Sequence, residues 1–245
     1  MKLVVGISGA SGAIYGLRIL EVLQQANIET HLVMSDSAKR TIVYETDYSI
    51  DQVKKLATHV HDINDVGACI SSGSFKHAGM VLAPCSIKTL SAISSSFNTN
   101  LLVRAADVCL KERRKLVLML RETPLHLGHL RLMCNVTEAG AVLVPPLPAF
   151  YHRPKTLEDI IDQSVNKALD QFDLGVELNL FKRWTGNEER EKAKTSPLTA
   201  APRSSKAVCV AGLAKAPASS RWTGSTGSFA PSSALPPTPA HSTSA

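Results

Sequence analysis

A glycine- and serine-rich segment near the start of the chain constrains the fold more than any other feature. It reads Gly6-Ile-Ser-Gly-Ala-Ser-Gly-Ala-Ile-Tyr-Gly16 and follows the apolar run Lys2-Leu-Val-Val5, which is typical of a buried strand. Apolar residues then recur at roughly helical spacing, at Ile14, Leu17, Leu20, Val22 and Leu23. We therefore predict a strand, a tight turn and a helix. Backbone N–H groups and the helix dipole at such a turn suit an anionic phosphate, and Ser8 and Ser11 add hydroxyl donors.

The spacing of the glycines separates this turn from two common nucleotide-binding motifs. It is G-x-x-G-x-x-G rather than the dinucleotide pattern G-x-G-x-x-G, and the next apolar run ends in Ser35 rather than in an acid. No Gly-Lys-Ser/Thr follows, as a Walker A loop requires. Because a Gly/Ser turn also permits close packing, the turn by itself leaves a phosphate site and a purely structural turn open.

Short apolar runs alternate with helix-like segments along the chain. They cover residues 3–5, 29–34, 79–83, 115–120 and 141–144. This alternation predicts an α/β fold, a three-layer sandwich with a mostly parallel sheet between two layers of helices. Ligands bind such sheets at the carboxyl ends of the strands. Residues with hydroxyl, amine, guanidinium or carboxylate side chains follow nearly every run at that edge, at 8–11, 35, 84–89, 121–122 and 145–151.

Composition and charge divide the chain into two parts. From about Thr195 onward the residues are almost all Ala, Pro, Ser, Thr and Gly, which cannot bury enough apolar surface to offset the entropy of ordering. We expect a folded domain over residues 1–188 and a low-complexity, disordered tail over 189–245. The tail carries a net charge of +5 out of the +6 of the whole chain. The basic balance therefore gives no support for a nucleic-acid partner of the folded domain.

Cysteine usage and the beginning of the chain indicate the compartment. The five cysteines are an odd number without a C-x-x-C pair, which argues against a zinc site or a disulfide framework and for a reducing environment. The chain begins with a strand-like run instead of a signal-peptide layout, and no apolar run reaches membrane-spanning length. We expect a cytoplasmic protein without a membrane span.

An acidic segment near residue 160 has two interpretations. Glu158-Asp-Ile-Ile-Asp162 resembles the carboxylate cluster of magnesium-dependent prenyl-diphosphate enzymes. Thr156, however, looks like an N-cap, and acids are typical of the first turn of a helix. Since no second acidic cluster is present to hold more metal, we interpret the segment as the start of the last helix and predict no metal ligands.

Several segments, in order along residues 1 to about 186, resemble one family, the UbiX-type flavin prenyltransferases, and most of all its ubiquinone-biosynthesis branch. The matching segments are Val5–Gly16, Glu29–Ser35, Ile70–Phe75, Pro84–Leu90, Arg104–Val108, Leu110–Arg114, Arg121–Arg131, Pro145–Pro154 and Leu180–Trp184. The resemblance implies a Rossmann-like (flavodoxin-like) fold. It implies an enzyme that joins the dimethylallyl group of dimethylallyl phosphate to N5 and C6 of reduced FMN, without a metal ion. The prenylated FMN then serves a UbiD-type decarboxylase, and the chain assembles as a large homo-oligomer, such as a dodecamer, with active sites between subunits.

The resemblance also implies which residues form the site. FMN is bound by Gly9, Ala10, Ser11, Ser35, Ser86, Ile87, Lys88, Thr89 and Arg121. The dimethylallyl phosphate is bound by Arg104, Lys111, Tyr151 and Lys167. The catalytic residues are Ser11 near the flavin N5, Glu122 as a proton relay, and Arg104 and Lys111, whose charges stabilise the leaving phosphate. Glu122 has a structural alternative, a simple ion pair with Arg121. Lys167 stands where the family often has arginine, which keeps the charge but loses the forked geometry.

Two other functions stay open on the sequence. One is an FMN-dependent decarboxylase of the cysteine-decarboxylase group. That group has Pro-Ala-Ser-Ala-Asn-Thr where this chain has Pro84-Cys-Ser-Ile-Lys-Thr89, and it has a Pro-x-Met-Asn segment that is not found here. The other is a non-catalytic FMN-binding subunit, which the presence of Arg104, Lys111, Glu122 and Tyr151 disfavours.

Overall fold

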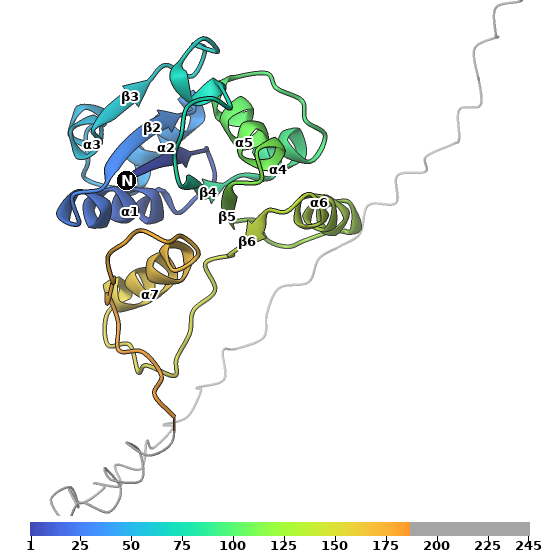
Figure 1. The fold of residues 1–245 in the computed structure, drawn as a ribbon. Helices are drawn as coiled ribbons and strands as arrows, with labels where there is room; N and C mark the ends of the chain where they lie inside the picture. Colours follow the sequence, from blue (N-terminus) through green and yellow to red (C-terminus); the bar gives the residue numbers. More distant parts are fainter. Residues whose placement is uncertain (187–245) are drawn as a thin grey trace, which may run out of the picture. The chain divides into compact units, whose positions relative to one another are not determined.

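The structure is a computed structural model that describes residues 1–186. Six parallel strands form one sheet in the order β3-β2-β1-β4-β5-β6 (Figure 1). The strands are β1 Lys2–Ile7, β2 Glu29–Met34, β3 His59–His61, β4 Gly79–Cys85, β5 Lys115–Leu120 and β6 Val142–Leu143. The helices are α1 Ala13–Gln25, α2 Asp36–Glu45, α3 Ile50–Leu56, α4 Ile87–Ser94, α5 Leu101–Lys111, α6 Leu127–Glu138 and α7 Leu157–Leu169, with a 3₁₀ turn η1 at Cys69–Ser71. The predicted parallel α/β sandwich is confirmed.

The five predicted strands are all present, and the structure adds a sixth. Residues 29–34 and 115–120 have the predicted bounds, whereas the last predicted strand shortens to Val142–Leu143. Strand β3 was not predicted because it has three residues, His-Val-His, and its first two are exposed. A short, exposed strand at the sheet edge lacks the apolar run that the prediction used.

The chain order reverses beside β1. This strand pairs with β2 on one side, from Lys2 opposite Glu29 to Ile7 opposite Met34, and with β4 on the other, where Val4 is opposite Met80. The loops that follow β1 and β4 therefore diverge to opposite faces of the sheet. In doubly wound folds ligands bind at the carboxyl ends of the strands beside this reversal. We call this region of the present chain, around the ends of β1 and β4, the crevice.

Each face of the sheet has its own core. Alternate strand residues such as Val5 and Leu32 pack with α1, α2, α3 and α7. Their neighbours Val4 and Val33 pack with α4, α5 and α6 on the opposite face. Helix α7 lies against α1 (Figure 1), and the guanidinium of Arg18 joins the two helices by donating to both carboxylate oxygens of Asp162, at 2.6 and 3.2 Å.

The acidic segment at the start of α7 is engaged within the fold. Thr156 caps the helix, as predicted, by accepting the N–H of Asp159 at 3.2 Å. Asp159 in return accepts the N–H groups of Thr156 and Lys155, and Asp162 binds Arg18. The contacts of these carboxylates support the interpretation as a helix start.

Gly16 sets the distance between α1 and β4. A Cβ at this position would lie 2.3 Å from the carbonyl oxygen of Ala83 and 3.0 Å from the side chain of Ile7. We expect Gly16→Ala to lower the free energy of unfolding by about 1–3 kcal/mol, because backbone and buried side chains must move to admit the methyl group. Urea denaturation measures the change. Gly67→Ala is the matched control, since its Cβ would meet only Asp65 Oδ1 at 3.3 Å, and equal effects of both variants would contradict the packing argument.

Two further expectations concern a membrane span and the boundary of the folded domain. None of the helices within residues 1–186 is long and apolar enough to cross a membrane. The predicted boundary at residue 188 and the predicted disorder of 189–245 lie outside the described residues.

Candidate functional site

The loops after β1 and β4 are tied together by Ser8. Its hydroxyl donates to the carbonyl oxygen of Pro84 at 2.9 Å and accepts the N–H of Ser86 at 2.7 Å. Ser8 is only 1 % exposed. The two serines of the turn therefore have different tasks, which the sequence did not distinguish: Ser8 braces the strand ends, whereas Ser11 is exposed at the surface of the turn.

The turn after β1 binds an anion in this structure, the carboxylate of Glu45. Gly12, whose φ of 95° favours glycine, and Ala13 donate their N–H groups to Glu45 Oε2 at 2.8 and 3.1 Å. Burial acts to raise the pKa of Glu45. The hydrogen bonds from Ser11, Gly12 and Ala13, together with the charge of Arg121, outweigh it and hold that pKa below its usual value. The anion-binding character predicted for the turn is thus visible in its contacts.

Glu45 is a site residue that the sequence analysis missed. It is the last residue of α2, 33 positions from Gly12, and no motif marks it. Its role depends on how α2 packs beside α1. The single local signal is that α1 has no side-chain cap and no acid in its first turn, so its free N–H groups need a partner from elsewhere.

Two more helices begin at the same edge of the sheet. Ser35 caps α2 by accepting the N–H of Ala38 at 3.1 Å, and Ser86 caps α4 by accepting the N–H of Thr89 at 3.4 Å. The starts of α1, α2 and α4 therefore direct the positive ends of three helix dipoles to the crevice. Gly9 permits this approach, because a Cβ there would lie 2.3 Å from Ser37 Oγ.

Two cationic side chains, Lys88 and Arg121, follow the strands at this same edge. Lys88 is exposed in the first turn of α4. Arg121 follows β5, and its backbone N–H donates to the carbonyl oxygen of Cys85 at 3.0 Å, which places it beside the loop after β4. Burial raises the pKa of Tyr15 and the charge of Arg121 opposes the rise, so Arg121 also lies near the start of α1. These contacts place the turn, Ser35, Ser86–Thr89 and Arg121, the residues predicted to bind FMN, at one edge of the sheet.

Glu122 lies next to this group without pairing with its neighbour. It is half-buried, and its Oε1 accepts the N–H of Thr123 at 3.0 Å. Within residues 1–186 no ion pair joins Glu122 to Arg121. The structural alternative of an Arg121–Glu122 pair is therefore not what the chain forms, and the carboxylate is left beside the crevice.

Among the residues predicted to bind the prenyl donor, Lys111 and Tyr151 lie apart from this group within one chain. Arg104, on α5, donates to the carbonyl oxygen of Ser71 at 3.2 Å and to Asp107 at 3.1 Å. Lys111 ends α5 just before β5 begins and forms an ion pair with Glu112. It therefore lies at the amino edge of the sheet, whereas Arg121 lies at the carboxyl edge.

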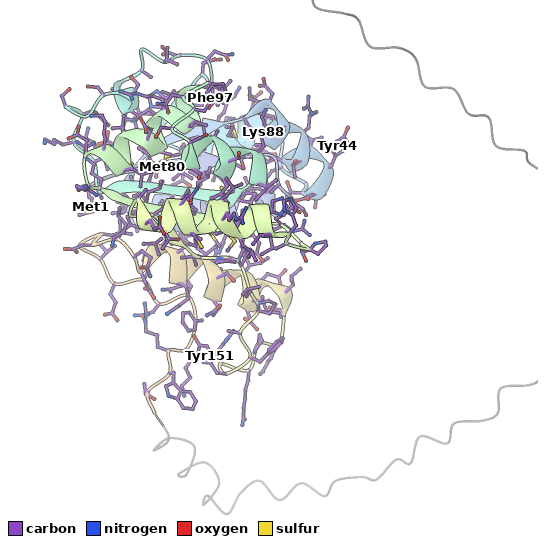
Figure 2. All side chains as sticks on the ribbon, turned by 90° about the vertical axis from the view of Figure 1, so that its right-hand side faces the viewer. Met1, Tyr44, Met80, Lys88, Phe97 and Tyr151 are labelled. Atoms are coloured by element: carbon purple, nitrogen blue, oxygen red, sulfur yellow. The ribbon has the colours of Figure 1, made fainter. Side chains whose placement is uncertain are left out.

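Tyr151 and Lys167 come from the last part of the domain. The hydroxyl of Tyr151 accepts from Gln163 Nε2 at 3.3 Å, and Figure 2 places this tyrosine well apart from Lys88 at the start of α4. Lys167 is exposed in the last turn of α7. The structure therefore does not bring Tyr151 and the other predicted donor residues together with Lys88 within one chain.

The fold and the carboxyl-edge group define a doubly wound α/β protein whose topological switch point offers N–H donors, hydroxyls and cations, the groups that suit an anionic ligand. The Flavoprotein family model matches residues 1–165. The flavin prenyltransferase UbiX of Thauera aromatica is 78% identical over 195 residues, which cover 80% of this chain and 100% of that relative. This chain belongs to the family of UbiX-type flavin prenyltransferases.

Solved structures agree with this membership. The crystal structure of AnUbiX (PadA1) in complex with FMN and dimethylallyl pyrophosphate matches with a TM-score of 0.74 and 54% identity, over 76% of this chain and 97% of that one. A dodecameric FMN-dependent UbiX-like decarboxylase from Escherichia coli O157:H7 matches with a TM-score of 0.73 and 49% identity, over 76% of this chain and 100% of that one. The resemblance found in the sequence is confirmed.

Proposed function

We propose that this chain joins the dimethylallyl group of dimethylallyl phosphate to N5 and C6 of reduced FMN and releases phosphate. The C–O bond of the donor breaks with its electron pair going to the phosphate, and C–N5 and C–C6 bonds form. N5 and C6 each release a proton, and the prenyl double bond takes one up. The observation that carries the proposal is the set of three helix starts at the crevice, in a chain 78% identical to a flavin prenyltransferase.

The residues at the crevice fit a flavin phosphate. A phosphate group needs N–H donors, hydroxyls and a cation. The cap of α4 occupies the N–H of Thr89, so the N–H groups of Ile87 and Lys88 point from the helix start towards a ligand, beside the hydroxyls of Ser86 and Thr89. Arg121 and the Lys88 ammonium supply positive charge. We assign FMN binding to these groups together with Gly9, Ala10, Ser11 and Ser35.

Two carboxylates at the crevice can accept a proton, those of Glu45 and Glu122. Glu45 receives a hydrogen bond from Ser11, and Glu122 lies after β5 beside Arg121. We assign Ser11 and Glu45 to the proton that leaves N5, and Glu122 to the relay that the resemblance implies. Positive side chains stabilise the leaving phosphate, and the resemblance predicts no requirement for a metal ion.

We further propose that a second copy of the chain completes the donor site. Lys111 and Tyr151 lie away from the crevice of their own chain, Arg104 is engaged by Ser71 and Asp107, and a UbiX-like relative is dodecameric. Large apolar side chains are exposed on the later segments, among them Leu127 at 60%, Leu147 at 71% and Phe150 at 70%. Burying such side chains between subunits favours a homo-oligomer. A UbiD-type decarboxylase as the recipient of the product, and a cytoplasmic location, rest on the resemblance.

One assay tests the proposed reaction. The full chain is incubated without oxygen with FMN, a reductant and dimethylallyl phosphate, and the flavin is then weighed by mass spectrometry. We expect a flavin that is heavier by one five-carbon unit. Unchanged flavin, under conditions where the protein is shown to bind FMN, would rule the reaction out and favour a non-catalytic FMN-binding subunit.

Lys167 offers a test of the donor phosphate site. Because arginine adds a forked pair of donors at the same charge, we expect Lys167→Arg to lower the KM for dimethylallyl phosphate by about two- to tenfold, with kcat little changed. Steady-state kinetics measures both constants. Lys155→Arg, at another exposed lysine of the same part of the chain, is the matched control. An unchanged KM in Lys167→Arg would remove this residue from the donor site.

A further inference from the structure

Three histidines, a cysteine and a carboxylate form a cluster at the β2–β3 edge of the sheet, away from the crevice. His31 lies on β2, His59 and His61 on β3, and Cys69 in η1. The register places His31 beside His59 and Val33 beside His61. Alternate residues of a strand share a face, so the rings of His59 and His61 both stack on His31, at 4.5 and 5.2 Å between centroids.

Three ligand atoms of this cluster point to one another. The Nδ1 of His31 lies 2.9 Å from the Nε2 of His61 and 4.0 Å from the Sγ of Cys69, and all three atoms lie within 4.8 Å of one another. Around a tetrahedral zinc ion the N···N distance is about 3.3 Å and the N···S distance about 3.6 Å, given usual bond lengths. Shifts of about 0.4 Å bring the two distances from His31 to these values, and the distance between His61 Nε2 and Cys69 Sγ, which is at most 4.8 Å, must close to about 3.6 Å.

A carboxylate also holds the ring of His31 from the side opposite to His61 and Cys69. Its second ring nitrogen, Nε2, lies 3.3 Å from Glu29 Oε1, and that carboxylate is anchored by Lys2 at 3.0 Å. Metal-binding histidines usually donate their other N–H to a carboxylate, which orients the ring and leaves the facing nitrogen free to bind. A proton on Nε2 of His31 leaves the Nδ1 lone pair directed at His61 and Cys69.

The exposure of two of the three ligands allows an ion to reach them from the solvent. His31 is only 3% exposed, His61 is half-buried and Cys69 is exposed. An ion bound by the three would thus have protein on one side and solvent on the other, with its fourth position open to water. The spacing of the cysteines gave no indication of this set, because two of its three ligands are histidines on neighbouring strands, 30 residues apart.

We propose that His31 Nδ1, His61 Nε2 and Cys69 Sγ bind one zinc-class divalent cation, with Glu29 as a positioning residue. The mixed nitrogen and sulfur donors select such an ion over magnesium or calcium, which prefer oxygen. The ion joins the three-residue strand β3 and the segment that follows it to β2. None of the three ligands is among the residues assigned to FMN, so FMN binding serves as an independent check of folding.

Cobalt is the probe for the wild-type site. The full chain, freed of metal with a chelator under a thiol-free reductant, is titrated with Co²⁺. We expect a thiolate-to-cobalt charge-transfer band and the intense visible bands of a four-coordinate ion, saturating at one equivalent, and Zn²⁺ should displace the cobalt. Absence of the charge-transfer band from the wild-type chain would overturn the proposal.

Variants identify the ligands. We expect Cys69→Ser to abolish the charge-transfer band and His61→Ala to weaken zinc binding by about tenfold or more, whereas Glu29→Gln keeps the band and weakens binding about 10- to 100-fold. The matched controls are Cys134→Ser, at another exposed cysteine, and His59→Ala, at the neighbouring ring that contacts Glu29. Each variant must still bind FMN as the wild type does. If His59→Ala removes the ion and His61→Ala does not, or if Cys69→Ser keeps the band, the assignment is wrong.

Discussion

Replacement of Glu45 by glutamine is expected to slow flavin prenylation by about 10²- to 10⁴-fold while FMN stays bound. The amide oxygen of glutamine still accepts the N–H groups of Gly12 and Ala13, so the turn keeps its conformation. The variant loses the negative charge and with it the ability to take a proton. Because N5 of the flavin must give up its proton when it is alkylated, the carboxylate hydrogen-bonded to Ser11 is the group whose loss should affect the chemical step most.

Single-turnover kinetics with reduced FMN measures the rate, and flavin fluorescence measures FMN affinity. Asp51→Asn is the matched control, since Asp51 is an exposed acid on α3, outside the three helix starts at the crevice, and pairs with Lys54 at 3.1 Å. It should leave the rate unchanged. A Glu45→Gln enzyme with full activity would show that this carboxylate only caps α1 and takes no part in proton transfer.

Mixing two inactive variants is expected to restore about one quarter of the wild-type activity, if the active site is shared between subunits. In one chain Glu45 lies at the carboxyl edge of the sheet and Lys111 at the amino edge. When Glu45→Gln and Lys111→Ala chains are co-expressed and assemble at random, half of the sites receive an intact Glu45. Half of these receive an intact Lys111 from the neighbouring chain, so about a quarter of the sites are complete.

The control pair is Glu45→Gln with Arg121→Ala. Both of these residues belong to the crevice of the same chain, so every mixed site lacks one of them and no activity should return. Product formation in the mixed oligomers, measured by mass spectrometry of the flavin, distinguishes the two cases. Failure of the Glu45→Gln and Lys111→Ala pair to regain activity would place the entire site within one chain and contradict the proposed role of the oligomer.

Local sequence patterns were sufficient to predict the fold and the turn after β1. The apolar runs predicted the central strands because buried parallel strands need continuous apolar residues. The turn after β1 was predicted from its own glycines and serines, because turn conformations are determined by neighbouring residues. Ser35 and Ser86 were indicated by their positions at strand ends and by the family resemblance, and their role as helix caps came from the structure. Strand β3 was not predicted because it has three residues, of which the first two are exposed.

Packing between segments that are distant in the sequence determined the roles of the other residues. Ser8 is a brace and not a ligand because Pro84 and Ser86 lie within reach of its hydroxyl. Glu45 joins the site only because α2 packs beside the start of α1, and a cysteine and two histidines meet only because β2, β3 and η1 are neighbours in space.

The sequence by itself therefore determined the parallel α/β architecture, the anion-binding turn at Gly6–Gly16 and the family resemblance, since each is carried by residues close together in the chain. Only the tertiary structure decided which carboxylate faces that turn. It also separated Lys111 from the crevice, because α5 carries this residue to the opposite edge of the sheet. Side chains far apart in sequence meet according to how helices and strands pack, and no local pattern encodes that arrangement.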